Sequence, residues 1–279
     1  MMGRIPGALL RAVLIAATIA TPALLLTGPL SNGPEIIVFI ALVAGIFVFS
    51  EYHTVFPSIL EFRDAPPLNR LRFLAFAGTV VTLTLIAKNA IHSTEFTSAL
   101  AGIGALVGHT LDFPYSPVRL LVLMLPADAS ADLFTSVRTA AGVGYAICLL
   151  AIIAFILAVR VKGWPTGNGA FNVWTNLPLF DPTAGGDVVD RLYTDARVNI
   201  IIGVLLPFII PAAIKLSSGL IDPAGLADAN VLVWTICAWA FMPASMIMRG
   251  IAMARIASLI EEKRRRAYAV AEAEGVQAA

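Results

Sequence analysis

The stretch TAAGVGYAICLLAIIAFILAV, residues 139–159, decides the fold class of this chain. It contains no charged side chain, and nearly all of its residues are apolar. The hydrocarbon core of a bilayer is about 30 Å thick, so a helix needs roughly 20 apolar residues to cross it. Residues 139–159 therefore predict a membrane-spanning helix.

Five other segments pass the same test of length and composition: residues 9–28, 34–50, 71–87, 198–214 and 229–248. The first of them resembles a secretory signal peptide, because Arg4 and Arg11 precede or open an apolar run. That run is longer than a signal peptide needs, and it lacks an Ala-x-Ala cleavage site, so a retained helix is favoured. We therefore expect an all-α integral membrane protein in which residues 1–250 form one bundle of six transmembrane helices.

Composition supports this class. Of the 279 residues, 58% are hydrophobic and 13% are charged, and the mean hydropathy is +0.85. Soluble proteins carry about 25% charged residues, which keep their surfaces solvated. The composition excludes a soluble enzyme, a nucleic-acid-binding protein and a disordered chain, and it makes the lipid bilayer the expected partner.

The distribution of charge predicts the orientation. If the N-terminus is cytoplasmic, all of the 19 Lys and Arg residues except four fall on the cytoplasmic side, the exceptions being Lys88, Arg119, Arg138 and Lys215. Cytoplasmic segments of membrane proteins carry an excess of Lys and Arg. We therefore expect both termini in the cytoplasm, in a bacterial inner membrane, with residues 251–279 as a basic helical tail.

The longest outer connection, residues 88–138, is too apolar for a solvated loop. Residues 95–110 and 117–125 each read as a short helix, too short to span, so the pair is either re-entrant or lies on the outer surface. Gly104 and Gly108 have the GxxxG spacing that lets helix backbones approach closely. These two glycines are a candidate interaction surface.

Three features are expected on the inner side. The loop between the second and third spans holds a second candidate surface for a protein partner, made of Glu61, Arg63, Asp64 and Arg70, although it could equally be an elbow that anchors two helices. Residues 188–198 form an amphipathic stretch that predicts a helix lying in the inner interface. The basic cluster of the tail predicts lipid headgroup contact through Lys263, Arg264, Arg265 and Arg266.

Motifs for chemistry are sparse. His92 and His109 are candidate metal ligands only if a turn brings them together, and no third ligand accompanies them in a recognisable spacing. The sequence contains no HExxH, GxSxG, Walker or CxxCH motif. No catalytic residues and no cofactor are therefore expected.

Two functions remain open. The absence of ionisable residues from the middle of the spans favours a non-catalytic accessory, assembly or scaffold subunit that packs against other membrane proteins or against itself. The alternative is a channel or carrier for a small neutral or apolar solute. That alternative would use the hydroxyls and helix kinks expected at Thr79, Thr82, Thr84, Pro207, Pro211 and Pro243.

Overall fold

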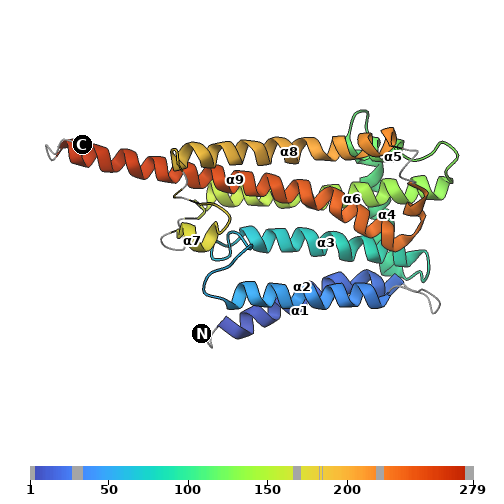
Figure 1. The fold of residues 1–279 in the computed structure, drawn as a ribbon. Helices are drawn as coiled ribbons and strands as arrows, with labels where there is room; N and C mark the ends of the chain where they lie inside the picture. Colours follow the sequence, from blue (N-terminus) through green and yellow to red (C-terminus); the bar gives the residue numbers. More distant parts are fainter. Residues whose placement is uncertain are drawn as a thin grey trace.

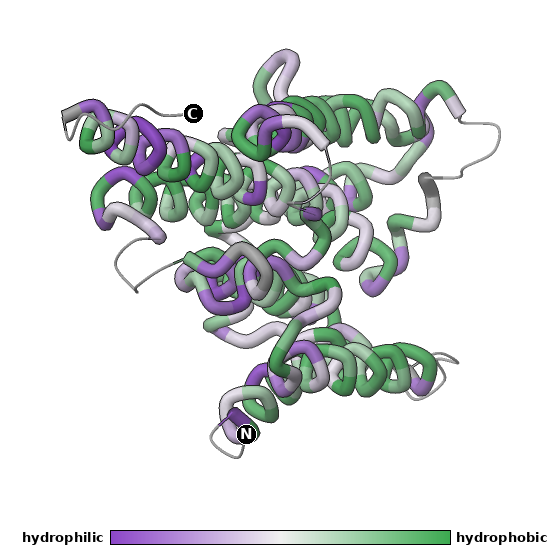
Figure 2. Tube along the Cα trace, turned by 60° about the vertical axis from the view of Figure 1, so that its left-hand side comes forward, coloured by the Kyte–Doolittle hydropathy of each residue, from purple (hydrophilic) through white to green (hydrophobic). Residues whose placement is uncertain are grey.

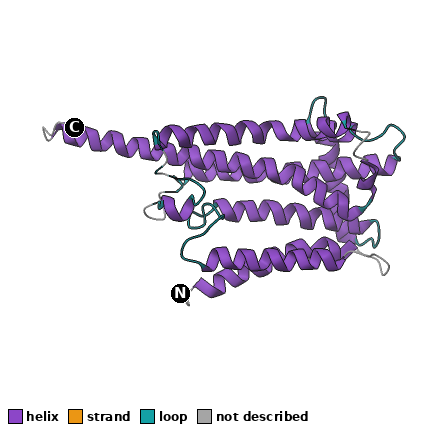
Figure 3. Cartoon of the chain, viewed as in Figure 1, coloured by secondary structure: helices purple, strands orange, loops and turns teal. Residues whose placement is uncertain are grey.

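A computed structural model describes residues 4–26, 34–165, 171–181, 183, 185–217 and 223–273 of the chain. The structure is all-helical, with 80% helix, and the described residues contain no strand (Figure 3). Six of its helices are long and apolar enough to cross a membrane. The predicted all-α class is confirmed.

The helices follow one another with short connections. In chain order they are α1 (Ile5–Leu26), α2 (Pro34–His53), α3 (Leu68–Asn89), α4 (Glu95–Leu111), α5 (Pro117–Leu123), α6 (Ala131–Val161), α7 (Val173–Asn176), α8 (Val188–Leu216), the 3-10 helix η3 (Pro223–Ala227) and α9 (Ala229–Ala273). The last two residues of the predicted first span, 27 and 28, and the last six of the predicted tail, 274–279, lie outside the described residues.

The six long helices run side by side, and the start of α1 and the end of α9 lie at the same end of the bundle (Figure 1). We call this the terminal end, and it also holds α7. The opposite end, called the α4 end, holds α4 and α5 (Figure 1). Helix α1 packs along α2 and against α3, α4 crosses α6, and α8 packs along α9. The α1–α2 hairpin therefore forms one edge of the bundle, and α8 forms the opposite edge.

Apolar side chains fill the interior in two clusters. The cluster toward the α4 end includes Val80, Leu121, Val137, Ile236 and Trp239. The cluster toward the terminal end includes Phe62, Phe155, Trp164, Leu192 and Ile256. Apolar residues also cover much of the outside of the long helices (Figure 2). Such broad exposure of apolar side chains suits contact with lipid rather than water.

One expected element is wrong. Residues 188–198 do not form a separate helix in the interface, because they are the first turns of α8 and continue directly into its apolar part. Their apolar side packs against α9, where Val189, Leu192 and Ala196 join Ile256 and Ala257 in one buried cluster. The sequence between positions 188 and 198 contains neither Pro nor Gly, so nothing bends the helix away from the bundle axis.

Candidate functional site

The most extensive polar cluster of the described residues lies at the terminal end, in residues 51–72, which we call the elbow. Its first charged group is Glu51, near the end of α2. The Glu51 carboxylate accepts hydrogen bonds from the backbone N–H groups of Ser58, Ile59 and Leu60, at 3.1, 3.0 and 2.9 Å, and from the Ser58 hydroxyl. One carboxylate therefore holds the loop folded back on the end of α2.

Arg63 closes the end of α2 from the other side. Its guanidinium donates to the carbonyl oxygens of Glu51, Thr54 and Val55 at 3.0, 2.7 and 2.9 Å. The last carbonyls of a helix, here that of Glu51, have no helical donor and need partners of this kind, and the carbonyls of Thr54 and Val55 follow directly after the helix. The Arg63 side chain is only 3% exposed, and it acts as a cap rather than as a surface cation.

Glu61 joins the elbow to α9. Its carboxylate, 6% exposed, accepts hydrogen bonds from Nε and Nη2 of Arg249 at 2.5 and 2.7 Å. Two parallel bonds between a guanidinium and a carboxylate are among the strongest polar contacts in proteins. Close by, Arg72 of α3 donates to the carbonyl oxygen of Ser245 at 3.1 Å, and its buried Nε has no hydrogen-bond partner.

Aromatic side chains join the elbow to the segment around α7. Phe62 is fully buried with φ of 55° and packs against Trp164 and Phe171. The Trp164 indole donates to the carbonyl oxygen of Ala65 at 3.1 Å. Asn176 accepts from the backbone N–H groups of Phe62 and Asp64, at 2.6 and 3.0 Å. The elbow, the segment around α7 and α9 therefore form one interlocked unit.

A hollow of about 610 Å³ lies beside this unit. Its lining combines two aromatic rings, two prolines and two polar side chains, from Phe56, Pro57, Asn172, Pro178, Phe180 and Asp181. Arg191 stacks over the Phe180 ring with its guanidinium carbon 4.8 Å from the ring centroid. The hollow is at the terminal end of the molecule, and it does not lie between the apolar parts of α3, α8 and α9.

Of the four elbow residues proposed as a docking surface, the structure exposes two. Asp64 and Arg70 are exposed, whereas Glu61 and Arg63 are buried in hydrogen bonds within the chain. For Glu61 and Arg63 the expectation of a docking surface is therefore corrected. A charge is buried at low cost only where a partner compensates it. Glu61 and Arg63 have such partners within the chain, so they are not available to a docking protein.

Gly104 and Gly108 are also used within the chain. Both are buried, and a Cβ on Gly108 would lie 2.8 Å from the carbonyl oxygen of Arg138 in α6. The facing residue in α6 is Gly142, and a Cβ there would lie 2.8 Å from the backbone nitrogen of Gly108. The close approach that the spacing predicts therefore joins α4 to α6, and these glycines contribute nothing to an exposed surface.

The α4 end has its own charge cluster around one buried carboxylate. The Asp112 carboxylate, 5% exposed, pairs with Arg138 of α6 at 2.8 Å and with Arg119 of α5 at 3.3 Å. Asp112 thus ties α4, α5 and α6 together. The Asp112 carboxylate therefore binds two guanidiniums, which are not the partners of a metal ligand.

The structure does not bring His92 and His109 together. His92 lies just before the start of α4, and His109 is near its end, about 21 Å from Glu95 along the helix axis, since each residue adds about 1.5 Å. The expectation that a turn could pair them is therefore wrong. Both side chains are exposed, and the described residues contain no cluster of three or more His, Cys, Asp or Glu that could hold a metal ion.

The basic cluster of the tail stands on the part of α9 that projects beyond the bundle (Figure 1). Arg264 pairs with Asp187 at 2.8 Å, and Arg265 lies 3.7 Å from Glu261. The pKa of the Asp187 carboxyl is held below its ordinary value, first by the Val189 backbone N–H and then by Arg264. Lys263 is about 20 Å along the helix from Arg249, so contact between the cluster and lipid headgroups stays a prediction.

Two of the three threonines expected to line a pathway, Thr79 and Thr84, are buried in the bundle instead, and Thr82 is half-buried. Thr84 donates to the carbonyl oxygen of Val80 in its own helix at 2.7 Å, and the Thr79 hydroxyl lies 4.0 Å from the Cys148 sulfur. Both threonine side chains are 0% exposed. They are packed against neighbouring helices and do not border a described cavity.

Sequence reasoning missed a further polar contact, between α8 and α9. Pro211 has no N–H, so the carbonyl oxygen of Pro207, four residues earlier, has no helical donor. The buried indole N–H of Trp239 donates to that oxygen at 3.1 Å. The Pro-x-x-x-Pro spacing indicates the unsatisfied carbonyl, but the sequence does not show that Trp239 lies opposite it.

No family model matches this sequence, and no curated protein or solved structure is significantly similar to it. The geometry alone therefore carries the functional argument.

Proposed function

We propose that this chain is an integral membrane protein that acts as a non-catalytic accessory, assembly or scaffold subunit. Its six long apolar helices support the membrane placement. The excess of Lys and Arg in the segments at the terminal end supports a cytoplasmic position for that end, in a bacterial inner membrane.

The observation that carries this proposal is that the buried carboxylates all bind donors within the same chain. Glu51, Glu61 and Asp112 are each bound by donors of the same chain, at one end of the bundle or the other. Carriers and proton relays place ionisable groups inside their spans, and such groups are expensive unless they have a function. In this chain the buried charges hold helix ends together, and the described interior between the ends is apolar.

The surface area gives independent support. The accessible surface is 15605 Å² for a chain of 29.5 kDa. A compact folded monomer of that mass exposes about 11,500 Å². The α1–α2 hairpin lies at one edge of the bundle, and part of α9 projects beyond it (Figure 1). An open arrangement of helices leaves extensive faces for neighbouring membrane proteins or for lipid.

The channel alternative needs a polar cavity bordered by α3, α8 and α9. Where α3 and α9 meet α6, Val80, Ile236 and Cys237 are buried in one apolar cluster, and Trp239 of the same cluster contacts Pro207 of α8. This packing favours the subunit over the channel.

Purification from native membranes in a mild detergent, after chemical cross-linking, tests the proposal. We expect a stoichiometric membrane-protein partner or a homo-oligomer. Recovery of a monodisperse monomer alone, from membranes in which the chain is expressed at its natural level, would contradict the proposal. A matched pair of variants then locates the contact: the double charge reversal Asp64→Lys with Arg70→Glu should reduce capture if the elbow docks, whereas Glu95→Lys, exposed at the opposite end, should not.

A further inference from the structure

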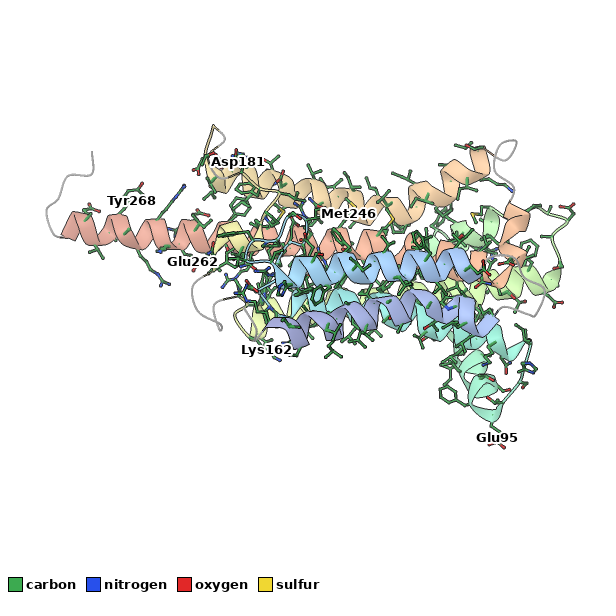
Figure 4. All side chains as sticks on the ribbon, turned by 60° about the horizontal axis from the view of Figure 1, so that its bottom comes forward. Glu95, Lys162, Asp181, Met246, Glu262 and Tyr268 are labelled. Carbon is green, nitrogen blue, oxygen red and sulfur yellow. The ribbon has the colours of Figure 1, made fainter. Side chains whose placement is uncertain are left out.

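Helix α4 differs from the six long helices in direction. It leaves the bundle sideways at the α4 end, with Glu95 at its far tip (Figure 4). Its N-terminus is fixed to the end of α3, because Asn89 accepts hydrogen bonds from the Thr97 and Ser98 hydroxyls at 2.9 and 3.1 Å. Its C-terminus is fixed by the ion pairs of Asp112. Both ends are thus tied to the bundle, and the direction of α4 is a built feature.

Helix α4 meets α6 about one bilayer thickness away from Arg160, near the other end of α6. Gly108 contacts α6 at Arg138, Thr139 and Gly142. From Thr139 to Arg160, near the other end of α6, the helix is about 30 Å long. This length equals the thickness of a bilayer core. If Arg160 marks one polar boundary of the membrane, α4 lies at the other.

The exposed surface of α4 is divided into two sides. With about 100° per residue, the packed face with Thr97, Gly104 and Gly108 lies between an apolar side and a polar side. The apolar side carries Phe96, Ala99, Ile103 and Leu106, three of which are 61–67% exposed. The polar side carries smaller or polar residues, namely Glu95, Ser98, Gly102, Ala105 and His109, all exposed.

Thr110 is the one hydroxyl on the apolar side. Its side chain donates to the Leu106 carbonyl oxygen at 2.8 Å, so it needs no water. The apolar side is therefore suited to a water-free environment along its length.

We propose that α4 lies in the plane of the bilayer surface at the α4 end, with Phe96, Ile103 and Leu106 inserted among lipid acyl chains and Glu95, Ser98 and His109 facing water. A helix with one apolar and one polar side binds a membrane in this way, with its apolar face about 5–10 Å below the headgroup boundary. The inference rests on the membrane placement proposed above but not on the subunit role. It selects the surface-lying arrangement over a re-entrant one, and it names lipid as the occupant of the exposed apolar side.

Site-directed spin labelling tests the inference. Single cysteines at Ile103 and Leu106 on the apolar side, and at Ser98 and Ala105 on the polar side, are labelled in the full chain. The chain is reconstituted in vesicles of phosphatidylethanolamine and phosphatidylglycerol. Cys148 and Cys237 are 1% and 2% exposed and are replaced by Ala in the background chain. Collision rates with oxygen, which concentrates in lipid, and with a water-soluble nickel complex give the depth of each label.

We expect the labels at 103 and 106 to collide mainly with oxygen and those at 98 and 105 mainly with nickel, with a depth difference of about 10 Å across the helix. Labels exposed to nickel on both sides would overturn the inference in favour of a water-exposed lid. Labels in lipid on both sides would overturn it in favour of a re-entrant helix. Protection of the apolar side from both reagents would show a protein occupant instead. None of these outcomes depends on partner capture, so the two proposals fail separately.

Discussion

Arg249 donates two hydrogen bonds, at 2.5 and 2.7 Å, to the carboxylate of Glu61, a residue 188 positions earlier in the chain. The pair fixes α9 to the elbow at the level where the long helices end, and Arg72 lies beside it. This contact joins two segments that are remote in sequence.

Glu61→Gln should destabilise the protein by about 1.5–3 kcal/mol, because the half-buried Arg249 guanidinium loses the charge that accepts its two hydrogen bonds. Thermal unfolding in detergent measures the effect. Asp64→Asn is the matched control in the same loop, and since the Asp64 side chain is 53% exposed it should change stability by less than about 0.5 kcal/mol. Glu61→Gln combined with Arg249→Met should recover part of the loss. Equal effects of the Glu61 and Asp64 substitutions would contradict the assignment.

Trp239→Phe should cost about 1–3 kcal/mol, because the carbonyl oxygen of Pro207 loses its only non-helical donor in the described structure. The sharper test is a rescue. Pro211→Ala restores a backbone N–H that can donate to the same oxygen, so Pro211→Ala should be better tolerated in the Trp239→Phe chain than in the parent. Thermal unfolding of the four chains measures the coupling. Strict additivity would show that the indole N–H does not replace the missing bond.

Gly142→Ala should be destabilising by about 1–3 kcal/mol or more, because the added methyl group meets the backbone of Gly108. Gly102→Ala provides the contrast, since a Cβ at that exposed position of α4 meets nothing within 4 Å. In the middle of a helix this change should stabilise by about 0.5–1 kcal/mol. Unfolding midpoints of the two variants check both signs, and a stable Gly142→Ala protein would mean that α4 and α6 are further apart.

The Asp187 carboxyl should titrate below the ordinary aspartate pKa of about 3.9. A pKa that is lower in the folded protein stabilises the fold above the unfolded value, and this contribution disappears as the pH falls through the folded pKa. Acid should therefore loosen the start of α8, seen as faster amide exchange at Val189. Carbon NMR of labelled aspartate measures the midpoint.

Arg264→Gln should raise the Asp187 pKa only part of the way to its ordinary value, because the Val189 N–H, the larger cause, remains. Arg266→Gln is the control, since Arg266 belongs to the same basic cluster but no ion pair of Arg266 is described. A full return to the ordinary pKa in Arg264→Gln would show that the ion pair alone sets it.

Part of the candidate site follows from the sequence. Glu61, Arg63 and the two glycines of α4 are conspicuous there, and each is at a point of close contact in the structure. The partners are not predictable in the same way. Nothing near Glu61 in the sequence indicates Arg249, and nothing near Gly108 indicates Gly142, because these pairs form only when remote helices come together.

The sequence by itself determined the helical class and the long apolar segments, because hydropathy over about 20 residues is a local sum that needs no knowledge of the fold. Only the tertiary structure decided which faces of those helices are buried. The apolar side of residues 188–198 would suit a membrane surface equally well, and it packs on Ile256 and Ala257 because α8 continues straight alongside α9. An amphipathic pattern predicts that one side of a helix is removed from water. The packing of the whole chain determines which neighbour covers that side.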